Sequence, residues 1–162
     1  MTMLQRSYWT LFARCLHVAN LSERAVDPKE VITRFLFQSS HFAVTTGRVN
    51  PTALMPYDNK NSKRWETSII RTDGLQDREG WELGYQIHEA SPAPRRIKAR
   101  AVGTAVIVTD QHLQFDINGD PYPRHADIIG WPVGDEKHAR LALATEIANR
   151  MTLEVDTRPQ KQ

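Results

Sequence analysis

Five side chains that can bind phosphate or move protons lie in segments with the composition of turns: His41, Arg48, Arg71, Arg124 and His125. Histidine titrates near neutral pH, and arginine holds phosphate oxygens through paired hydrogen bonds. If the fold brings His41 and His125 together, they can serve as the acid and base of a nuclease-like or transferase-like enzyme, with the three arginines binding the ligand. The alternative is structural: His41 bonds within its own loop, and Arg124 pairs with Asp127 or another acid.

A second group of basic residues favours nucleic-acid binding without catalysis. Arg96, Lys98 and Arg100 alternate with apolar residues along a predicted strand, so they share one face of it. Tyr57 and Trp65, beside the polar loop 58–64, can stack on bases. The alternative for the basic face is an ordinary solvated sheet surface.

Several kinds of site are absent from the sequence. It has no glycine-rich phosphate loop, no paired-histidine zinc helix and no nucleophile elbow around a serine. Cys15 is the single cysteine, which excludes an intramolecular disulfide and a cysteine zinc site. The segment from Asp116 resembles the start of a calcium loop, but Pro121 stands where glycine is needed. We therefore expect neither a metal nor a cofactor.

Hydrophobic periodicity predicts a mixture of helices and strands. Residues 121–132 contain three prolines and are predicted to form a rigid polar loop that presents Arg124 and His125. Asp27-Pro28-Lys29-Glu30 is typical of a helix start and predicts a helix through Leu36, although the apolar residues 35–37 also suit a strand. Further helices are predicted from about 77 to 87 and from 136 to 151, and strands at 66–71, 95–102, 104–109, 113–117 and 153–155. With the strands grouped mid-chain, we expect an α+β fold, mainly antiparallel, with an N-terminal and a C-terminal amphipathic helix.

The 162 residues predict one domain, residues 27–155, between an N-terminal helical extension, 1–26, and a frayed tail, 156–162. Residues 4–19 have the spacing of an amphipathic helix, which packs on its own domain or offers a surface for a protein partner or self-association. A net charge of +2 is too small to imply nucleic-acid binding by itself. The sequence contains no apolar run of membrane-spanning length and no signal peptide, so we expect a cytoplasmic protein without membrane contact.

Four blocks give the chain a resemblance to known sequences. They are residues 34–42, Arg-Phe-Leu-Phe-Gln-Ser-Ser-His-Phe, then Arg48-Val49, residues 66–71, and residues 123–132, Pro-Arg-His-Ala-Asp-Ile-Ile-Gly-Trp-Pro. In this order the blocks resemble those of a group of small uncharacterised bacterial proteins. The similarity covers residues 34 to 155. It implies no fold, substrate or mechanism.

Overall fold

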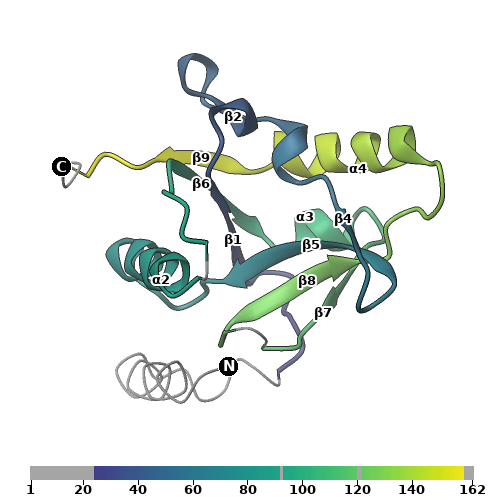
Figure 1. The fold of residues 1–162 in the computed structure, drawn as a ribbon, viewed down its shortest axis with the longest axis horizontal. Helices are drawn as coiled ribbons and strands as arrows, with labels where there is room; N and C mark the ends of the chain where they lie inside the picture. The colour runs from purple at the N-terminus through teal and green to yellow at the C-terminus, as the bar shows by residue number, and fades with distance from the viewer. Residues whose placement is uncertain (1–23, 92, 120–121, 159–162) are drawn as a thin grey trace.

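The computed structural model describes residues 24–91, 93–119 and 122–158. They form one α+β domain built on a mainly antiparallel sheet, as the sequence predicts (Figure 1). The predicted N-terminal helix, residues 4–19, and the predicted extension up to residue 23 lie outside the described residues. None of the described helices combines the length and the apolar character needed to cross a membrane.

Within the described residues, seven strands form the main sheet. Their order is β7-β8-β5-β1-β6-β9, and β4 adds to β5 through a hairpin. The strands are β1 Val31–Leu36, β4 Tyr57–Asn59, β5 Arg64–Arg71, β6 Ala99–Thr104, β7 Gln114–Asp116, β8 His125–Ile129 and β9 Thr152–Val155. A separate ribbon pairs β2 Phe42–Ala43 with β3 Arg48–Val49.

Helices cover both faces of the sheet. α2 Asp77–Glu89 packs Leu83 and Ile87 on Phe35 and Ile70, while α4 Lys137–Asn149 joins the larger core that holds Ile32 and Ile69. Because neighbouring residues of a strand point to opposite faces, Ile69 belongs to the core on one face of the sheet and Ile70 to the core on the other. The short helix α3 Val106–Thr109 and the 3-10 turns η2 Ser39–His41, η3 Val44–Thr46 and η4 Pro51–Ala53 complete the fold.

The two halves of the sheet meet at a short ladder and then diverge. β1 pairs with β6 over six residue pairs, but with β5 over only two, Ile32 with Arg71 and Thr33 with Ile70. Beyond Thr33, β1 runs with β6 and β9 away from β5, β8 and β7 (Figure 1). We call the place where β1 and β5 diverge the fork. Its closed end is at Arg71, and by its open end we mean the opposite end, where the segment 39–56 approaches Arg34.

Most predicted elements form where expected. The predicted helices at 77–87 and 136–151 correspond to α2 and α4, and the strands at 66–71, 113–117 and 153–155 to β5, β7 and β9. The strand predicted at 95–102 begins only at Ala99, as β6, so Arg96 and Lys98 precede it. α2 begins with a capping box, in which the Gln76 backbone N–H donates to Glu79 Oε2 at 2.8 Å. α4 buries Ala144, Ile147 and Ala148 together with the charged residue Arg140.

Three predictions are wrong. The predicted helix through Leu36 is β1, because only one turn forms at Asp27–Glu30 before the chain enters the sheet. Residues 104–109 are not a strand: β6 ends at Thr104, and α3 follows. The predicted loop at 121–132 contains β8, whose residues 125–128 are buried between β5 and β7.

Candidate anion-binding site

The side chain of Arg34 occupies the fork. Its Nη1 donates a hydrogen bond to the Ser68 carbonyl of β5 at 2.6 Å, and its Nε donates to the Ala53 carbonyl at 3.3 Å. The guanidinium thus forms a hydrogen bond with a backbone carbonyl of β5 just beyond the last residue pair that joins β1 to β5. It makes no ion pair with any residue that the structure describes, and its Nη2 has no hydrogen bond there. A fixed cation with a spare donor is therefore held at the open end of the fork.

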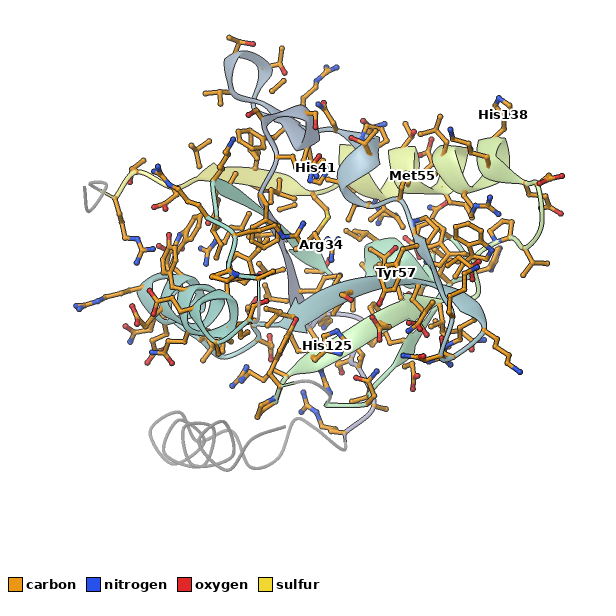
Figure 2. All side chains as sticks on the ribbon, viewed as in Figure 1. Arg34, His41, Met55, Tyr57, His125 and His138 are labelled. Carbon is orange, nitrogen blue, oxygen red and sulfur yellow. The ribbon has the colours of Figure 1, made fainter. Side chains whose placement is uncertain are left out.

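Polar and charged side chains surround this cation. In the view of Figure 2, Arg34 lies between His41 and His125, with Tyr57 to its side. His41 belongs to η2 and is half-buried, while Tyr57 begins β4 and places its hydroxyl 3.5 Å from Glu66 Oε2. The η2 turn and the start of β4 thus bring His41 and Tyr57 to the open end of the fork, near Arg34.

Burial and the charge of Arg34 both affect the pKa values of His41 and Tyr57. Burial lowers the pKa of His41, and the charges of Arg34 and Arg95 lower it further, so this imidazole is neutral at pH 7. Burial raises the pKa of Tyr57, so its hydroxyl stays protonated and donates to Glu66 Oε2. Burial lowers the pKa of the Arg34 guanidinium itself, but arginine remains charged in proteins. The open end of the fork therefore combines the positive charge of Arg34 with neutral hydrogen-bonding groups and with the negative charge of Asp127, which acts on Arg34 from β8.

A chain of hydrogen bonds on β5 and β8 forms one wall of the site. Ser68 Oγ donates to Asp127 Oδ1 at 3.0 Å, and Asn118 Nδ2 donates to Asp127 Oδ2, also at 3.0 Å. His125 Nδ1 lies 2.8 Å from Asn118 Oδ1, and its Nε2 lies 3.6 Å from Asp127 Oδ1. Asp127 is thus engaged by Ser68, Asn118 and His125, and no ion pair joins it to Arg34.

The structure keeps the two predicted catalytic histidines apart in their contacts. His125 is 5% exposed at the start of β8 and packs edge-on against Tyr122, with 5.0 Å between the ring centroids. Among the described residues, no hydrogen bond or ring contact joins it to His41. The charge of Arg34 lowers the pKa of His41, which links this histidine to the open end of the fork.

The three predicted ligand-binding arginines have different surroundings. Arg48 is exposed on β3. Arg71 is fully buried at the closed end of the fork and forms an ion pair with Glu30, with Nη2 2.8 Å from Glu30 Oε2. Arg124 is buried in a left-handed conformation, φ 69°, and its Nη1 donates to the carbonyls of Arg71 and Asp73. In these contacts Arg71 pairs with a buried carboxylate, and Arg124 links the backbone at residues 71 and 73.

The predicted basic strand face is divided. Arg96 and Lys98 are exposed, and Lys98 Nζ donates to Ser39 Oγ at 3.0 Å. Arg100 is buried, paired with Asp77 and Glu154, and packed over the Trp81 ring at 4.6 Å. Its charge is therefore neutralised within the fold, which leaves Arg96 and Lys98 as the solvent-facing cations of this face.

Sequence reasoning did not select Arg34 or Ser68, and it considered Tyr57 only as a ring that can stack on bases. The sequence signal for Arg34 is a cation in the middle of the apolar run Val31–Leu36, where burial of a charge requires a reason. The residues described by the structure contain no cluster of three His, Cys, Asp or Glu side chains that could hold a metal ion.

Comparison with known proteins gives no match for this geometry: no family model, curated protein or solved structure is significantly similar to the chain.

Proposed function

We propose that the protein binds a phosphate-containing ligand, a nucleotide or nucleic acid, at the open end of the fork. The observation that carries this proposal is the Arg34 guanidinium, which two backbone carbonyls hold in place while its Nη2 keeps spare donors. Arginine held in this way is suited to phosphate because its donors form a planar fork. The Tyr57 hydroxyl and the neutral His41 imidazole add hydrogen-bonding groups without adding a negative charge.

Binding is better supported than acid–base catalysis by His41 and His125. Catalysis by that pair requires both rings to reach one ligand, whereas His125 is held by Asn118 and packs against Tyr122. The nuclease-like or transferase-like reaction is therefore secondary to binding in this proposal. A non-catalytic nucleic-acid-binding subunit would use the same phosphate contacts.

Replacing Arg34 by methionine is expected to remove phosphate binding. In the wild-type protein, inorganic phosphate raises the melting temperature in a concentration-dependent way, because a ligand that binds only the folded state stabilises it. In Arg34→Met this rise should disappear, whereas Arg34→Lys, which keeps the charge but loses the planar fork, should retain part of it. The measurement is a thermal unfolding series with phosphate at constant ionic strength.

The matched control is Arg48→Met, which removes the same charge from an exposed position on β3. It should respond to phosphate as the wild type does. Because Arg34→Met also leaves the Ser68 and Ala53 carbonyls without their donor, its melting temperature without ligand must be recorded first. A phosphate response in folded Arg34→Met equal to that of the wild type would disprove the proposal.

A further inference from the structure

A cavity of about 720 Å³ lies between α2, residues 94–97 and the C-terminal segment 156–158. Its size falls within the range of small-molecule sites, roughly 300–1,000 Å³. None of the site residues predicted from the sequence contributes to it except Arg96. The groups that line it include Tyr85 and His88 of α2, Arg95, Arg96 and Arg158.

The α2 wall of the cavity is aromatic and has an unused polar group. Tyr85 stacks on Trp81, with 6.0 Å between the centroids and 16° between the planes, and Arg158 covers its ring. The Tyr85 hydroxyl oxygen is buried and has no hydrogen-bond partner in the described part of the chain. Because buried hydroxyls are normally paired, this one is available to a ligand.

His88 continues this wall as a neutral ring. It meets Phe37 edge-on, with 4.3 Å between the centroids. Burial, together with the charges of Arg95 and Arg34, lowers the pKa of His88 to about 4, so its ring carries no charge at pH 7. Tyr85 and His88 thus offer the combination of π-face and hydrogen-bonding atoms that suits a nucleobase.

Charge is divided across the cavity. Arg95 and Arg96 lie together on the 94–97 side, whereas Glu82 and Glu89 lie on α2. Arginines attract phosphate, and carboxylates accept hydrogen bonds from ribose hydroxyls and base amino groups. A ligand with a phosphate at one end and donors at the other matches this division.

The cavity adjoins the fork through the end of β1. Phe37, three residues after Arg34, contacts His88 in the cavity wall and lies 5.0 Å beneath the Arg95 guanidinium. The Lys98 N–H donates to the Leu36 carbonyl at 2.9 Å, which fixes the 95–98 segment beside β1. The cationic side of the cavity is therefore attached to the strand that supplies Arg34.

We propose that this cavity binds the nucleoside part of a nucleotide whose phosphate is held between Arg95 and the fork. The inference rests on the proposed function and makes it specific, because it names a nucleoside monophosphate as the ligand. The base contacts Tyr85 and His88, displacing Arg158 from the Tyr85 ring or stacking on its guanidinium, and the phosphate lies on the arginine side.

The test compares inorganic phosphate, adenosine monophosphate and uridine monophosphate by calorimetric titration of the full chain. The nucleotides are expected to bind at least about 10-fold more tightly than phosphate, the gain that stacking on an aromatic side chain provides. Tyr85→Leu should remove this gain and leave phosphate affinity unchanged, while Tyr85→Phe, which keeps the ring, should lose less. Circular dichroism confirms that each variant is folded.

Backbone amide shifts in the wild-type protein give a second readout that needs no variant. Each nucleotide should shift the amides of residues 82–89 and 95–97, and inorganic phosphate should leave those of Tyr85 and its α2 neighbours unchanged. If phosphate binds through Arg34 but nucleotides bind no more tightly, the cavity inference is overturned and the proposed function stands. If nucleotides bind through Tyr85 and Arg34→Met has no effect, the cavity is supported and the role of Arg34 falls. No binding by any of the three ligands overturns both.

Discussion

Replacing Arg71 by methionine is expected to destabilise the protein by about 3–5 kcal/mol, the usual result of removing one partner of a buried ion pair. Glu30 is 1% exposed and Arg71 is fully buried, so the variant leaves a carboxylate in the protein interior. Arg24 lies 3.5 Å from the same carboxylate, but it is largely exposed and replaces little of the pairing. Urea unfolding at pH 7 measures the change in the free energy of unfolding.

The double variant Glu30→Leu, Arg71→Met is the control for lost packing. Because it removes both charges together, it should recover much of the stability that Arg71→Met loses. A double variant no more stable than Arg71→Met would mean that packing, and not the unpaired charge, accounts for the loss.

The dependence on pH provides an independent check. Burial alone would raise the pKa of Glu30, but the hydrogen bonds and charge of Arg71 outweigh it and lower the pKa below its ordinary value of 4.5. A lowered carboxylate pKa stabilises the folded protein above 4.5, and this contribution is lost as the pH falls through the folded-state pKa. The difference between wild type and Arg71→Met should therefore shrink below pH 4.5. A difference that stays constant down to pH 3 would contradict this account.

The second large effect is expected for Gly84→Ala, with a loss of about 2 kcal/mol. In an exposed helix the same change stabilises by about 1 kcal/mol, because alanine favours helix and glycine does not. At this position a Cβ atom would overlap the Phe35 ring, which packs directly against the α2 backbone. Chemical denaturation of the wild type and the variant gives the difference.

Gly80→Ala is the matched control, since it lies one turn earlier on the same face of α2. Its Cβ would meet only the tip of the Arg100 side chain, 2.8 Å from Nη1. That tip can shift within its ion pairs with Asp77 and Glu154 more easily than the Phe35 ring can move. We expect a smaller loss there. Phe35→Leu should relieve part of the loss in the Gly84→Ala background, and an increase in stability of Gly84→Ala alone would show that α2 does not approach β1 this closely.

The elements predicted correctly are those whose apolar spacing and whose flanking turn or capping residues indicate the same structure. α4 has apolar residues at helical spacing along its whole length, and β5 ends at the turn around Asp73 and Gly74. The helix start at residues 27–30 led to a wrong prediction because its local hydrogen bonds do form. The Glu30 N–H donates to the Asp27 carbonyl at 2.9 Å, and the Lys29 N–H donates to Asp27 Oδ1 at 2.8 Å. The turn stops after one cycle, since Val31–Leu36 is stabilised more by pairing with β5 and β6 than by continuing as a helix.

The other errors have similar causes. A short apolar run such as 104–109 suits either a buried strand or a helix, and periodicity cannot separate the two. Prolines before residue 124 and at 132 suggested a loop, yet they only flank β8. The candidate site was harder to find, because Arg34 is brought to Tyr57 and Ser68 by strand pairing across the chain. No local pattern encodes the two-pair ladder that leaves the fork open.

The strands on the two sides of the fork alternate along the chain. β5, β7 and β8 come from residues 64–71 and 114–129, while β1, β6 and β9 come from 31–36, 99–104 and 152–155. Any stretch of chain that contains all the strands of one side therefore also contains a strand of the other side. Neither side can be cut out as a fragment that folds on its own. We expect the described domain to unfold as one cooperative unit, even though only two residue pairs join β1 to β5.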